Sequence, residues 1–279
     1  MNVRLRKHDP YNGRAALRRG FDIWRRGSAA LPLLAAMNLL AAGGGAAATT
    51  NDLSDAEIQG RKLAQQLCEA RPVENFTNTG ALKIKKQGSA WANHPIRFQL
   101  NITPTNWGIV YCSDYPTNND ILSTSSSASI LEITHNGNQP NEYLLQEGSC
   151  LAVVIRGSDT MRPYADSDFW IADLGLEFFH WPQQKLLKKE VKRSRGCSVL
   201  QSTNPGPFTN GYSRVVSWID NESGGIVQAE AYDFKNKLLK EFAPKSFKKV
   251  NGQWELQEME IRNVQTGSRT RLEFDLKKE

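Results

Sequence analysis

Four histidines are the first candidates for acid–base or metal chemistry. They are His8, His94, His135 and His180, and no two of them stand at a spacing typical of a metal site. His180 lies in the aromatic stretch 178–182 (FFHWP), where a histidine at a helix end or in the core is favoured over a catalytic base. The sequence therefore predicts neither a metal centre nor a cofactor.

Carboxylates and hydroxyls give no stronger catalytic pattern. Asp168 and Asp173 could form an acid–base pair, but capping and surface roles are favoured for these two acids, and Asp168 is placed to cap a short helix. Ser126 lies in a serine-rich tract without the flanking glycines of a nucleophile elbow, and Glu177 and Asp220 are isolated acids. The sequence contains no phosphate-binding loop and no dinucleotide fingerprint. We therefore expect a binding protein and not an enzyme.

Large aromatic side chains are the remaining candidates for a site. They could be ordinary core residues, or some could line a cavity for lipid. The apolar residues are densest at 169–181, which we call the aromatic segment, and its density suggests a movable lid over such a cavity. The candidates for the cavity or lid are Trp107, Phe169, Trp170, Phe178, Phe179, Trp181, Trp218 and Trp254.

The first 48 residues differ from the rest of the chain in charge and hydropathy. Basic residues precede an apolar run at 29–40 and small residues at 41–48, which is typical of a secretory signal peptide. The apolar run is short for a membrane span. We expect a signal peptide at 1–48, cleaved near Ala48, and a single soluble periplasmic domain at 49–279. An uncleaved N-terminal anchor is the alternative.

Net charge and cysteines narrow the class further. The leader holds eight of the 35 basic residues and two of the 29 acidic ones, so the remainder is balanced and lacks the positive field of a nucleic-acid binder. The four cysteines, Cys68, Cys112, Cys150 and Cys197, match no zinc pattern. They allow three disulfide pairings in an oxidising compartment, and free thiols remain possible.

The elements that must position these residues are one helix and many strands. An amphipathic pattern with a Ser54/Glu57 capping box predicts a helix at 53–70. Alternation of apolar and polar residues at 96–102 predicts a half-buried strand. Turn residues recur about every ten positions after 185, including Asn251-Gly252, and indicate an antiparallel meander. The predicted strands in this half are 187–200, 212–220, 226–234, 238–250, 254–264 and 270–276.

The C-terminal half carries short motifs in a specific order. They are SDFWIADL at 167–174, YSRVVSWID at 212–220, AYD at 231–233 with LLK at 238–240, and GQW at 252–254 with EME at 258–260. Over residues 164–276 the chain thereby resembles the outer-membrane lipoprotein-sorting proteins, the LolA-like periplasmic carriers. The resemblance implies a mainly β fold, in which a strongly curved antiparallel sheet forms a half-open barrel covered by an N-terminal helix and a short aromatic helix.

The resemblance also implies a function. Such a protein holds lipoprotein acyl chains or another lipid in an apolar cavity, receives its cargo from an inner-membrane releasing complex and delivers it to an outer-membrane acceptor. Two other classes remain open. An envelope enzyme acting on a lipid or glycan requires polar residues that converge in the cavity. An outer-membrane interaction module requires a filled core with an exposed sheet edge or apolar patch.

Overall fold

The computed structural model describes residues 53–114, 128–206, 210–250 and 253–276. The predicted signal peptide, Ser126 and the Asn251-Gly252 turn lie outside these ranges. Among the helices of the described residues, none is long and apolar enough to cross a membrane.

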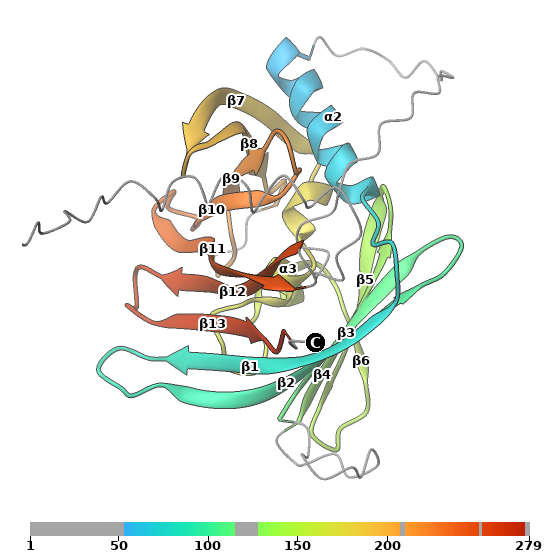
Figure 1. Ribbon diagram of the computed structural model, residues 1–279. Coiled ribbons are helices and arrows are strands. Elements are labelled where there is room, and N and C mark those ends of the chain that lie inside the picture. The colour runs from blue at the N-terminus through green and yellow to red at the C-terminus, as the bar shows by residue number, and fades with distance from the viewer. Residues whose placement is uncertain (1–52, 115–127, 207–209, 251–252, 277–279) are drawn as a thin grey trace, which may run out of the picture.

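A single antiparallel sheet of 13 strands forms most of the molecule and curves around a small group of helices (Figure 1). The strands are β1 (Phe76–Lys85), β2 (Ala92–Ile102), β3 (Trp107–Ser113), β4 (Ser129–Asn136), β5 (Gln139–Glu147), β6 (Val153–Ile155), β7 (Gln183–Lys192), β8 (Arg195–Thr203), β9 (Arg214–Asp220), β10 (Ile226–Tyr232), β11 (Leu238–Val250), β12 (Gln253–Asn263) and β13 (Arg269–Phe274). The helices are α2 (Asp55–Glu69), α3 (Ile171–Leu174) and two 3-10 helices, η3 (Gly157–Met161) and η4 (Glu177–His180).

The strand order shows that the barrel is half open. It runs β6-β5-β4-β3-β2-β1-β13-β12-β11-β10-β9-β8-β7, so β6 and β7 are free edges. Each half is a meander of neighbouring strands, and the pairing of β1 with β13 joins the two halves. The predicted fold class is confirmed.

Strict alternation of side chains explains why one face of the sheet forms the core. In β2, Ile96, Phe98 and Leu100 are buried and the residues between them are not. Phe98 is fully buried, and burial of such a side chain contributes about 1.5–3 kcal/mol. This period of two is the pattern predicted at 96–102.

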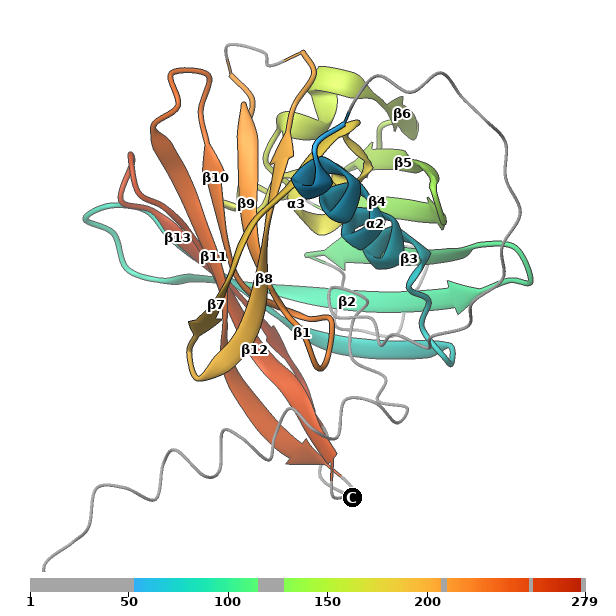
Figure 2. The ribbon, with the colours of Figure 1, turned by 90° about the horizontal axis from the view of Figure 1, so that it is seen from above.

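Helix α2 lies across the open side of the barrel, as Figure 2 shows. The Glu57 carboxylate accepts hydrogen bonds from the amide and the hydroxyl of Ser54, which confirms the predicted capping box. Gly60 lets the helix approach β7 closely, because a Cβ there would lie 2.6 Å from the Lys185 Cα. Beyond the other end, Arg71 donates to the backbone carbonyls of 103, 104 and 106. The helix and the residue that follows it thus link edge strand β7 to the turn between β2 and β3.

Two expectations about local structure were wrong. The predicted strand at 187–200 is the hairpin β7–β8, because Arg193 and Ser194 adopt positive φ of 49° and 64° and turn the chain. Asp168 does not cap a helix. In α3 the Trp170 amide donates to Asp173 Oδ2 at 2.8 Å, and Asp168 bonds elsewhere.

All four cysteines are free thiols.

Candidate functional site

The interior of the half-barrel contains a small cavity lined almost entirely by apolar side chains. Its volume is about 30 Å³. It lies between the aromatic segment and strands β9 to β12. Its lining residues are Phe169, Asp173, Leu176, Phe178, Tyr212, Val215, Ile226, Ala229, Ala231, Lys240, Phe242 and Ile261.

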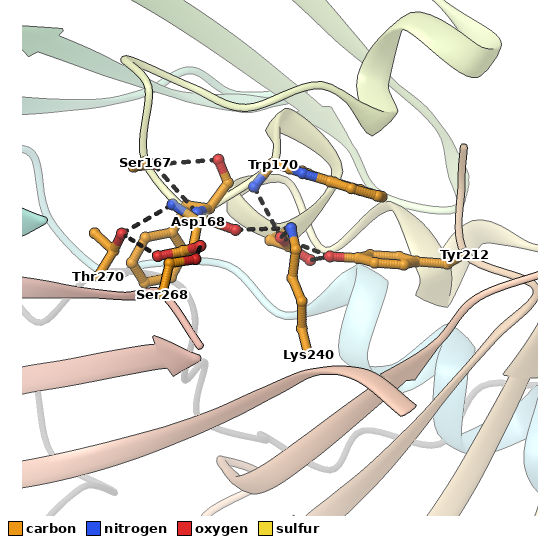
Figure 3. A network of polar contacts seen from close by, with 9 residues as sticks. Ser167, Asp168, Trp170, Tyr212, Lys240, Ser268 and Thr270 are labelled. Atoms are coloured by element: carbon orange, nitrogen blue, oxygen red, sulfur yellow. Dashed lines mark hydrogen bonds and ion pairs between the residues drawn. The ribbon is translucent and has the colours of Figure 1, made fainter. Parts of the chain in front are cut away.

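A buried lysine provides the main polar feature of this first cavity (Figure 3). Lys240 on β11 is 2% exposed, and its ammonium donates to the Asp168 carbonyl at 2.7 Å. The same group lies 3.5 Å from Asp173 Oδ2 and 3.6 Å from the centroid of the Trp170 ring. Lys240 therefore fastens the start of the aromatic segment to the sheet.

The two acids of this network are satisfied by other donors as well. The Asp168 carboxylate accepts from the hydroxyls of Ser268 and Thr270, which ties the segment to β13. Both oxygens of Asp173 lie 2.9 Å from the Tyr212 hydroxyl. Since each carboxylate is engaged, the network has the character of a structural fastening.

Burial changes the proton affinity of the network. Removal from water lowers the pKa of Lys240 to about 8, although Asp173 and Asp168 oppose the change. Burial, with the Asp173 charge second, raises the pKa of the Tyr212 hydroxyl well above its usual range. At neutral pH the lysine is charged and the tyrosine is a neutral donor.

A second cavity of about 30 Å³ lies on the other side of Leu176. His135 stacks on Trp107 in its wall, with ring centroids 3.7 Å apart. Burial, with the nearby His180 second, lowers the pKa of His135 to about 3, so this imidazole is neutral. The lining residues are Leu67, Cys68, Ala70, Trp107, His135, Leu174, Gly175, Leu176, Phe179 and His180.

Leu176 separates the two cavities and lines both. Its backbone is left-handed, with φ 51° and ψ 38°. That conformation costs a residue with a Cβ roughly 1–2 kcal/mol, which the surrounding contacts must offset. The backbone of Leu176 is thus strained at the point where this residue separates the two cavities.

An open polar groove of about 660 Å³ adjoins the cavities from outside, between β5 and the 3-10 helices. Glu177, next to Leu176, lies in its wall. The lining residues are Asn136, Gln139, Pro140, Asn141, Glu142, Tyr143, Ile155, Arg156, Gly157, Thr160 and Glu177.

The eight aromatic residues that the sequence offered as cavity or lid candidates differ in their positions relative to the two cavities. Phe169 and Phe178 line the first cavity, and Trp107 and Phe179 line the second. Trp181 packs in the core beside the Phe178 ring.

The other three candidates are not among the lining residues of either cavity. Half-buried Trp170 stacks on Tyr212 with centroids 4.5 Å apart, and half-buried Trp254 lies on β12. Trp218 packs in a cluster with Val216 on the opposite face of β9 from the interior residue Val215, and its indole donates to Glu190.

Several site residues were not among the sequence candidates. Lys240 and Tyr212 stood only inside the family-like motifs, and Leu176 had no signal, because its importance comes from backbone conformation. In the described part of the chain, no cluster of three His, Cys, Asp or Glu side chains could hold a metal ion.

Known structures share this fold at low sequence identity. A DUF1329 family protein from Desulfovibrio piger is 18% identical with a TM-score of 0.61, covering 80% of this chain and 92% of that one. A putative outer membrane lipoprotein-sorting protein domain from Vibrio parahaemolyticus is 19% identical with a TM-score of 0.60, covering 78% and 91%. The LolA superfamily protein NE2245 from Nitrosomonas europaea is 16% identical with a TM-score of 0.52, covering 80% and 92%.

Sequence comparison gives the family itself. None of the curated proteins matches this sequence. Residues 126–277, more than half of the chain, match the model of a family described as "Uncharacterized protein"-like. The chain therefore belongs to that family, and its fold is that of the LolA-like, outer-membrane lipoprotein-sorting proteins that its C-terminal motifs resemble.

Proposed function

We propose that this protein is an exported periplasmic carrier that holds the acyl chains of a lipoprotein or another amphiphile in its apolar interior. The observation that carries the proposal is the pair of mainly apolar cavities that Leu176, within the aromatic segment, separates. The few polar groups on the wall of the first cavity bond to one another, which favours a carrier over an enzyme. By the family resemblance, an inner-membrane complex would load the carrier and an outer-membrane acceptor would receive its cargo.

The cavities as they stand describe a closed state. Each has roughly the room of one water molecule, whereas sites for drug-sized ligands occupy about 300 Å³ or more. An acyl chain must therefore displace Leu176 and the phenylalanines beside it. Each buried methylene returns about 0.8 kcal/mol, so a chain of about 14 methylenes returns roughly 11 kcal/mol. This gain exceeds the cost of moving a few side chains.

The proposal is tested by filling the first cavity from the sheet side. Ala229 on β10 lines it and is 6% exposed. We expect Ala229→Leu to occupy the void and to weaken uptake of a fluorescent fatty acid at least about tenfold, while the variant stays folded. Ala152→Leu, at an exposed position, is the matched control and should bind like the wild type.

Two further measurements complete the test. Alanine at both Phe178 and Phe179 should alter lipid binding, and unchanged binding and stability would show that the aromatic segment is no lid.

Native mass spectrometry of the protein from the periplasm should reveal a lipid or acylated peptide that denaturation removes. A clean apo mass, together with no probe uptake by the wild type, would refute the carrier.

A second candidate is an interaction module of the outer membrane. The free edge strand β6 and the residue range before it expose Leu151, Val153 and Val154 at 89%, 51% and 58%. An open strand edge with apolar side chains suits a partner that adds a strand. Substitution of Val154 by lysine would abolish such pairing and leave lipid uptake unchanged.

A further inference from the structure

Glu177 is a carboxylate in an unusual position. It lies in the wall of the polar groove, between Leu176 and Phe178, which line the apolar cavities. A molecule with its acyl chain in the cavities and its head in the groove would pass this side chain. The inference below rests on the proposed carrier function, because it concerns the head of the same cargo.

The Glu177 carboxylate lacks the partners that the other buried acids have. Within the described residues it accepts one hydrogen bond, from the Tyr143 hydroxyl at 2.7 Å, and no cation lies within ion-pair distance. A carboxylate can accept about four. By contrast, buried Asp220 pairs with Arg195 at 2.9 Å and also accepts from Ser223. A half-buried carboxylate without a cation is costly unless a ligand compensates it.

Asn141 supplies a second unfilled acceptor in the same wall. It is 8% exposed, and its amide group donates to the Gly175 carbonyl at 2.7 Å and to the Tyr143 hydroxyl at 3.1 Å. Its Oδ1 atom is buried and makes no hydrogen bond of ordinary length in the described part of the chain, although the His135 ring interacts with this side chain. A carbonyl oxygen has two lone pairs, so Oδ1 keeps the capacity to accept from a further donor.

The rim of the groove does not supply the missing charge. Arg156 lines the groove but is exposed and makes no ion pair with Glu177. Glu142, also exposed, lies on the rim with the opposite charge. The two rim charges offset each other, and the carboxylate in the wall remains uncompensated. Burial raises the pKa of Glu177, in keeping with this deficit.

We propose that the groove binds the primary ammonium group of an amphiphilic cargo, with Glu177 as counter-ion and Asn141 as a further acceptor. An ammonium has three donors and one positive charge, which matches two unfilled acceptors and one uncompensated negative charge. An anionic head would meet the carboxylate and is disfavoured. The aminoethyl head of a phospholipid and the free N-terminus of an acylated peptide both present this group.

Matched ligand pairs test the proposal on the mature protein. Displacement of a bound, uncharged fluorescent acyl probe is measured with lysophosphatidylethanolamine against lysophosphatidylglycerol of the same acyl chain. A palmitoylated peptide with a free N-terminus is measured against its acetylated form. We expect the amine of at least one pair to bind about tenfold more tightly, the size of one charge-assisted hydrogen bond. The pair that shows the preference identifies the source of the ammonium.

Variants assign the preference to the groove. Glu177→Gln keeps the acceptor for Tyr143 and removes the charge, so it should bind both members of a pair equally. The matched control is Glu132→Gln, an exposed carboxylate on β4 outside the groove, which should keep the preference. Equal affinities within both pairs for the wild type overturn the inference and leave the carrier standing. Failure of every amphiphile to bind overturns both.

Discussion

Replacement of Lys240 by methionine should remove a pH-dependent part of the stability. The ammonium is 2% exposed, and its pKa falls from 10.5 to about 8 because burial outweighs the attraction of Asp173 and Asp168. Between pH 8 and 10.5 the unfolded chain therefore binds more protons at this site than the folded protein. The free energy of unfolding consequently rises with pH in this window. Below about pH 8 the lysine is protonated in both states, so Lys240 contributes little pH dependence there.

The size of the effect follows from the shift. From pH 7.5 to 9.5 the free energy of unfolding should rise by about 2 kcal/mol through Lys240 alone. Lys240→Met has no such group, so the difference between wild type and variant should change by that amount. Near neutral pH the lost hydrogen bond to the Asp168 carbonyl and the relieved burial of charge oppose each other, and the two proteins should be close in stability.

The assay is urea unfolding at several pH values between 7.5 and 9.5. Exposed Lys237 provides the control, and Lys237→Met should follow the wild type. The measurements stop below pH 10, because the pKa values of buried tyrosines such as Tyr212 are raised by folding. Above pH 10 these tyrosines ionise in the unfolded chain first, which lowers the free energy of unfolding. Parallel profiles for wild type and Lys240→Met would refute the account of a charged, buried lysine. Faster amide exchange at 168–176 in the variant would show that the fastening has been lost.

Three further changes test other contacts. Gly175→Ala places a Cβ 2.3 Å from the Tyr143 hydroxyl, so thermal unfolding should show a loss of about 1–3 kcal/mol. The pKa of His135 is about 3 in the folded protein and 6.5 in its ordinary state, so its contribution to stability is present above pH 6.5 and falls on acidification. Between pH 6.5 and 5, the free energy of unfolding of His135→Phe should therefore decrease by about 1–2 kcal/mol less than that of the wild type. Arg195→Met leaves Asp220 buried without its cation and should cost about 3–5 kcal/mol in urea unfolding, whereas a loss below 1 kcal/mol would contradict the buried pair.

Local signals made most of the fold predictable from the sequence. The helix at 53–70 corresponds to α2 because its capping residues and its apolar stripe are all local. The strands after 212 were found because turns such as Thr266-Gly267 carry residues that favour positive φ, and Gly267 has φ 73°. The β7–β8 turn was missed because Arg193 and Ser194 adopt the same region without being typical of it.

The site was less predictable, since tertiary contacts create it. Nothing in the run Leu-Leu-Lys at 238–240 shows that the lysine is buried, because its partner Asp168 lies 72 residues away in the chain. For Trp218 the prediction failed in the opposite way. As a large aromatic residue it was a candidate for the cavity wall, but the alternation of side chains along β9 places it on the other face of the sheet. Aromatic content thus marks the core, and the face of each strand decides what a residue can contact.

The pairing of β1 with β13 has a consequence for folding kinetics. Six residue pairs, from Gly80 with Phe274 to Lys85 with Arg269, join strands from opposite ends of the described chain. Gly80 permits the close approach, because a Cβ there would lie 2.0 Å from the Glu273 carbonyl oxygen. The half made of β1–β6 emerges first from the ribosome and must wait with the β1 edge open until β13 arrives. Non-local strand pairing of this kind is slow and exposes the waiting edge to aggregation, so the rate of joining at Gly80 should limit the yield of folded protein.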